Sequence, residues 1–193
     1  VQSREQAYLT FAREMYQRRK PVEIAVSYRY LGPQARQLLL FSQPDTNLRL
    51  ALPLRVEVIT ATGETQMVDS FVALGRRDTL SIPLAGAPKS LRVHLDSLLP
   101  VALNDQRPQT YLLYDLAQAK SAAQRQKALI TLLDSSNPSL KATVIGIALD
   151  NPDVRVQMRA MQAGETLNPS GKARLEFGLR KLAEKAAGPI GRQ

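Results

Sequence analysis

The chain lacks cysteine and tryptophan, and His94 is the single histidine among its 193 residues. Without cysteine there can be no disulfide bond, thiol nucleophile or zinc site built on thiolates. One histidine cannot form a two-histidine zinc site. Aromatic residues make up only 5% of the chain, so the core has to be built from aliphatic side chains. The lack of cysteine does not indicate the cellular compartment, because both cytosolic and exported proteins can lack this residue.

Long apolar runs are also missing, since 38–41 and 98–101 fall far short of the about 18 residues that suggest a membrane helix. We therefore expect no membrane span. The chain begins at Val1 without methionine or a signal peptide, and we expect it to be cut from a longer protein.

The net charge of +9 is compatible with nucleic-acid binding, but the basic residues are scattered along the sequence. Consecutive basic residues occur only at 18–20, 76–77 and 180–181. They are not interleaved with aromatic residues, as they are in single-strand binders that stack bases. We expect solvated basic faces and no specific nucleic acid, and a basic nucleic-acid-binding module remains the weaker alternative.

The hydrophobic rhythm changes once, close to residues 99–108. Apolar residues alternate in Val22–Val26, Leu54–Val58 and Leu91–Leu95, which is typical of half-buried strands. Later they recur at helical spacing, as in Ala128–Leu133. The sequence predicts strands at 22–30, 36–42, 48–60, 66–73, 78–83 and 90–96, and helices at 2–19, 109–120, 122–133, 138–149, 152–164 and 171–187.

Two similar turns, 134–138 and 150–153, each lead into a helix, which suggests stacked helix pairs of the HEAT kind. Asn137 and Asn151 are expected to cap these helices. The small residues Ala142, Gly146 and Ala160 are expected to permit close helix packing.

The predicted fold class is an all-β sandwich followed by an all-α HEAT-like helical module, with a short N-terminal helix. The predicted domains are an N-terminal helix ending a preceding domain (1–20), an antiparallel β-sandwich (21–103), a HEAT-like helical domain (109–187) and a loose tail (188–193).

Few residues are candidates for chemistry. His94 lies on the polar face of an alternating strand and is interpreted as a surface or edge histidine. A catalytic role would need an orienting carboxylate, for which Asp96 is the nearest choice on the same strand face.

Other polar positions also favour structural roles. Asp134, Asp150 and Asp153 lack the spacing of a calcium loop and fit helix caps better. Gly75, before Arg76 and Arg77, and the lone Gly86 do not form a phosphate loop. We assign no catalytic, cofactor-binding or metal-ligating residue and expect no cofactor in this chain.

Four segments, Lys20–Ile24, Leu38–Gln43, Leu52–Val56 and Leu91–Asp96, resemble the C-terminal region of gluzincin zinc aminopeptidases of the aminopeptidase N type. The resemblance implies that 2–19 is the last helix of a catalytic domain, and that a β-sandwich and a HEAT-like helical domain follow it. The family's His-Glu-x-x-His motif is absent here. Zinc is therefore expected only in a missing catalytic domain.

The resemblance favours a non-catalytic structural and interaction module that buttresses the catalytic domain and shapes substrate access. Its partners would be that preceding domain or another protein, with a peptide substrate bound through the parent. The chain alone would not be an enzyme, whereas the parent would be a candidate zinc aminopeptidase. A free-standing protein-binding adaptor is the main alternative.

Overall fold

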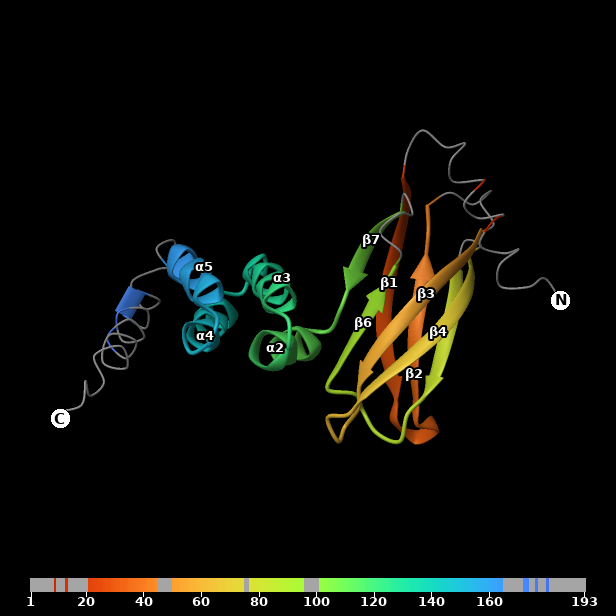
Figure 1. Cartoon of the computed structure of the whole chain (residues 1–193), viewed down its shortest axis with the longest axis horizontal. Helices are drawn as coiled ribbons and strands as arrows, with labels where there is room; N and C mark the ends of the chain where they lie inside the picture. Colours follow the sequence, from red (N-terminus) through yellow and green to blue (C-terminus); the bar gives the residue numbers. More distant parts are fainter. Residues whose placement is uncertain are drawn as a thin grey trace, which may run out of the picture. The chain divides into compact units, whose positions relative to one another are not determined.

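The computed structural model describes residues 21–44, 50–74, 77–95 and 101–164, together with the single positions 9, 13, 172, 173, 176 and 180. The chain divides into two compact units, Val1–Pro108 and Gln109–Gln193. We call them the strand unit and the helical unit. Figure 1 shows strands in the first and helices in the second.

The strand unit contains two sheets and a short 3₁₀ helix, η1 (Gly32–Gln34). The four-stranded sheet has the order β5-β2-β1-β7, and the three-stranded sheet has the order β4-β3-β6. The strands are β1 (Val22–Leu31), β2 (Arg36–Ser42), β3 (Leu50–Ile59), β4 (Thr65–Leu74), β5 (Arg77–Pro83), β6 (Ser90–His94) and β7 (Val101–Gln106).

Alternation along the strands decides which face is buried. In β3, Leu52, Leu54, Val56 and Val58 are all buried, as the period of two predicts. The buried face of the other sheet comes from β1 and β2, with Ile24, Val26, Leu39 and Phe41. Burying one face of each sheet gives the strand unit its aliphatic core, because a strand carries side chains to both sides in turn.

β7 differs from the prediction. The sequence predicts no strand after residue 96 and ends the β-sandwich at 103, yet β7 pairs with β1 in a parallel ladder from Val22↔Val101 to Ser27↔Gln106. The sequence concealed it because Asn104 and Asp105 have low strand propensity. Tertiary contacts compensate: Tyr28 donates a hydrogen bond to Asp105 at 2.6 Å, and Arg107 Nε lies 2.9 Å from the same carboxylate.

The predicted fold class, an all-β sandwich followed by an all-α HEAT-like module, is therefore wrong. The described residues form seven strands in two sheets, one of them mixed, and then four α-helices, with roughly equal strand and helix content. The chain combines α and β structure, with strands first and helices second. Periodicity reports which face of a strand is buried but not the direction in which its neighbour runs.

The helical unit contains α2 (Gln109–Gln118), α3 (Ala122–Leu133), α4 (Pro138–Leu149) and α5 (Val154–Gly164). Figure 1 shows α2 beside α3 and α4 beside α5. The four helices share one buried cluster, which includes Leu112, Leu116, Leu129, Leu132, Val144, Ile145, Leu149 and Val156. A common core of this kind does not support the predicted series of HEAT-like repeats, in which each unit buries its face only against the next.

The turns 134–138 and 150–153, which suggested a repeat, make different contacts. Asn137 caps α4, accepting hydrogen bonds from Ser139 and Leu140 at 3.0 and 3.3 Å, as predicted. Asn151 is buried and donates to the Leu116 carbonyl of α2 at 3.0 Å. Asp153 takes the capping position of α5, which begins at Val154 and not at residue 152.

The small residues of the helices also differ in their environments. Ala160 is fully buried, which confirms close packing there. Gly146 is exposed, and a Cβ built on it would meet no atom within 4 Å, so the packing role expected for Gly146 is wrong.

Some predictions lie outside the described residues, apart from single positions within them. These are the N-terminal helix 2–19 of segment 1–20, the helix 171–187 and the tail 188–193. In the part of the chain that the structure describes, no helix is long and apolar enough to cross a membrane.

Candidate functional site

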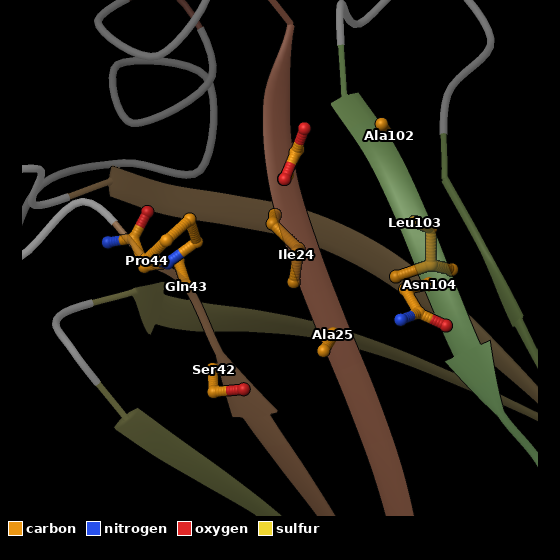
Figure 2. A pocket seen from close by; sticks show the side chains of 9 residues that line it. Ile24, Ala25, Ser42, Gln43, Pro44, Ala102, Leu103 and Asn104 are labelled. Carbon is orange, nitrogen blue, oxygen red and sulfur yellow. The ribbon is translucent and has the colours of Figure 1, made fainter.

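A hollow of about 590 Å³ opens on the four-stranded sheet. Figure 2 shows β1 running between the end of β2 and β7, with Ala25 in the middle. The residues that line it come from these three strands and the chain just after β2: Glu23, Ile24, Ala25, Ser42, Gln43, Pro44, Ala102, Leu103 and Asn104.

Strand register explains why a hollow forms here. Ala25 pairs with Ser42 on β2 and with Asn104 on β7, so these three side chains form one row across the sheet. Glu23 pairs with Ala102 in the next row of the same face. The two alanines carry only methyl groups between longer neighbours, which leaves a shallow floor.

The hollow lies on the outward face of this sheet. Glu23, Ala102 and Asn104 are exposed, whereas Ile24 and Gln43 are only 1% and 5% exposed and belong to the opposite face by alternation. The outward face therefore offers the Glu23 carboxylate, the Ser42 hydroxyl and the Asn104 amide. These groups can hold a cation or a hydrogen-bond donor.

Sequence reasoning did not find this hollow. The available signal was an alanine at 25 and another at 102, each within a strand, but their neighbourhood depends on the parallel β1–β7 pairing. Without that pairing, the two alanines have no known relation.

His94 lies on β6, an edge strand of its sheet, and its side chain is 43% exposed. This confirms the surface or edge interpretation. Its carboxylate partner is Glu57 on β3, with Nε2 3.0 Å from Oε2. Asp96, the partner considered from the sequence, lies outside the described residues.

Glu57 also binds Arg92, whose guanidinium lies 2.9 Å from the second carboxylate oxygen. Burial alone would raise the pKa of Glu57, but the hydrogen bonds from Arg92 and His94 outweigh it and lower that pKa. Glu57 and Arg92 are register partners, so the charge cluster fastens β3 to β6.

A second charge cluster fastens the helical unit. Arg125 of α3 donates to the Ala119 carbonyl at 2.6 Å, and its guanidinium lies 3.6 Å from Asp153. Asp153 also accepts hydrogen bonds from Arg155, which lower its pKa to about 2. The cluster joins the end of α2, the start of α3 and the start of α5.

The remaining sequence candidates are dispersed. Asp134 and Asp150 are exposed and follow the last residues of α3 and α4. Arg77 is exposed at the start of β5, whereas Gly75 and Arg76 lie outside the described residues. A Cβ on Gly86 would lie 3.2 Å from Ala61, so close approach explains that glycine.

No group of three or more metal-ligating side chains occurs among the residues described here.

Comparison with known proteins finds a similarity to solved structures but none to a family model or a curated sequence. No family model matches the sequence, and no curated protein matches it. Among solved structures, the chain is similar to the crystal structure of Legionella pneumophila aminopeptidase A in complex with aspartic acid, with a TM-score of 0.48 and 12% identity. The match covers 86% of this chain but only 22% of that one, so the chain spans about a fifth of that aminopeptidase.

Proposed function

We propose that the chain is a non-catalytic structural and interaction module from the C-terminal part of an aminopeptidase N-like zinc metallopeptidase. There it buttresses the catalytic domain and shapes substrate access. The proposal is supported by the resemblance of four segments to that family: Lys20–Ile24, Leu38–Gln43, Leu52–Val56 and Leu91–Asp96.

The observation that supports the structural role is that charged side chains form ion pairs and hydrogen bonds between neighbouring strands and helices. Glu57, Arg92 and His94 bind one another across β3 and β6, and Arg125 and Asp153 tie α2, α3 and α5 together. Arg92 and Glu57 are largely buried, so removing either one would leave the charge of the other without its partner and would destabilise the sheet.

The test combines elemental analysis of the dialysed 193-residue chain with an aminoacyl-anilide hydrolysis assay. We expect no stoichiometric zinc and no turnover. One tightly bound zinc per chain, or turnover that His94→Ala abolishes, would contradict the proposal. A His-Glu-x-x-His motif encoded upstream of Val1 in the full gene would support the proposed parent.

A second candidate, a free-standing protein-binding adaptor, is favoured by an exposed apolar pair. Val154 and Met158 lie one turn apart on α5 and are 61% and 53% exposed. An ordinary start codon or signal peptide directly upstream of Val1 would favour the adaptor over the metallopeptidase module.

A further inference from the structure

We propose that the hollow on the four-stranded sheet receives a lysine or arginine side chain carried by an extended peptide, which pairs with the edge of β7 that faces away from β1. This goes beyond the proposed function and does not depend on it. The argument uses the edge of β7, the alanine floor and the charge of the rim.

β7 is the end strand of its sheet. It pairs with β1 on one side, and in the described part of the chain no strand lies on its other side. An edge strand presents backbone N–H and C=O groups that can pair with an incoming strand. Peptide recognition by strand addition uses these groups for affinity and adjacent pockets for side-chain specificity.

Ala102 makes the hollow reachable from that edge. A strand added beside β7 carries every second side chain on the face that bears Ala102 and Asn104, because side chains alternate. A long side chain on this strand crosses the methyl group of Ala102 towards Glu23, the register partner of Ala102, and the space above Ala25 lies in the next row. A bulkier residue at 102 would close this path.

The rim selects a cation. Glu23 supplies an exposed carboxylate in the row next to Ala25, and Ser42 and Asn104 supply oxygen acceptors in the row of Ala25 itself. An ammonium or guanidinium group brings only donors, which these acceptors match. A carboxylate ligand would face Glu23 with like charge.

The probe is an acetylated and amidated peptide of alternating threonine and valine with one central lysine. Two matched peptides carry glutamate or norleucine at the centre. The full 193-residue chain is titrated with each peptide, and binding is followed by NMR shifts of backbone amides. We expect the lysine peptide to bind most tightly and to shift the amides of 101–106 on β7.

Two pairs of variants sharpen the test. Glu23→Gln should weaken lysine-peptide binding about two- to fivefold, as for one exposed charge pair. Glu64→Gln, in the hairpin between β3 and β4, should leave it unchanged. Ala102→Trp should abolish binding, whereas Thr79→Trp on β5, the other edge strand of the sheet, should not. Unchanged thermal midpoints confirm that the variants fold.

Three outcomes would overturn the proposal: equal binding of the three peptides, shifts on β5 in place of β7, and lysine-peptide binding that survives Ala102→Trp. Absence of binding for all three peptides would overturn it as well. None of these results bears on zinc content or hydrolysis, so failure of this proposal and failure of the proposed function are distinguishable.

Discussion

Ala35 is the one non-glycine residue of the described chain with a left-handed backbone, at φ 47° and ψ 49°. It follows η1, donates its N–H to the Gly32 carbonyl at 3.1 Å and accepts a hydrogen bond from Leu84 at 2.8 Å. These two bonds fix the conformation at the bend between β1 and β2. Alanine is strained there because its Cβ approaches the neighbouring carbonyl.

Replacing Ala35 by glycine should raise the free energy of unfolding by about 0.5–1 kcal/mol, since the relief of strain exceeds the added flexibility of the unfolded chain. Urea unfolding measures the change. Ala87→Gly serves as the control, because Ala87 is exposed and has an ordinary negative φ, so that substitution should be neutral or slightly destabilising. A loss of stability in Ala35→Gly would contradict the strain argument.

Gly146 offers the second change of a single residue. It lies inside α4, is exposed, and has open space where a Cβ would be. Gly146→Ala should raise the free energy of unfolding by about 1 kcal/mol, because glycine is a poor helix former. Circular dichroism during denaturation reports the change. Gly63→Ala should act in the opposite direction, because Gly63 has φ +97°.

Among the elements, the start of α5 depends most directly on one carboxylate. Asp153 accepts hydrogen bonds from the backbone and the side chain of Arg155, and Arg125 lies nearby. A carboxylate at a helix N-terminus also meets the positive end of the helix dipole. These contacts explain why its pKa falls to about 2, below the ordinary aspartate value of about 3.9.

The depressed pKa gives a signed prediction. The stability that Asp153 contributes is fully present above the ordinary aspartate pKa and is lost as the pH falls towards 2. Carboxyl NMR titration should place the midpoint near pH 2 in the unmodified chain. Arg155→Gln should raise this pKa, whereas Arg159→Gln should not, since Arg159 contacts Gln162 instead. A midpoint near pH 4 in the unmodified chain would show that the contact is not formed in solution.

At the same scale, the sequence predicts most elements well. The strand β2 and the helices α3 and α4 begin and end at the predicted residues, because clear periodicity meets clear turn signals, such as Asn137 before Pro138. The sequence does not predict β7, because the polar residues of this strand are held by partners distant in the sequence, such as Tyr28. Asn151 accepts a hydrogen bond from the Asp153 backbone N–H at 3.1 Å, but Asp153 is the residue that caps α5, and the Asn151 amide donates to Leu116 on another helix.

For the whole molecule, the sequence cannot supply the relation between strands. The row of Ser42, Ala25 and Asn104 exists only because β1 lies between β2 and β7. Periodicity gives the outward face of each strand separately. The candidate site was therefore beyond prediction, even though Glu23, Ala25 and Ser42 lie within predicted strands.

The net charge of +9 is also a property of the whole chain. Some of the basic side chains are paired with acidic ones: Arg55 lies 2.6 Å from Asp69, and Arg155 lies 3.0 Å from Asp153. We expect only non-specific nucleic-acid binding, with a dissociation constant on the order of 10⁻⁴ to 10⁻⁶ M that weakens steeply with salt. Fluorescence anisotropy with labelled DNA and RNA at two salt concentrations tests this. Sub-micromolar, sequence-dependent binding at physiological salt would contradict it.

The parallel pairing of β1 with β7 has a consequence for biosynthesis. A ribosome makes β1 first among the strands, and β2 follows it at once, but Gln106 must emerge before the other neighbour of β1 is complete. At about 5–20 residues per second, this leaves several seconds in which a strand destined for the sheet interior has an open edge. Newly made chains that meet during this interval can pair through β1. A chaperone that delays such encounters would thus act on the waiting time of β1 and not on the stability of the finished sheet.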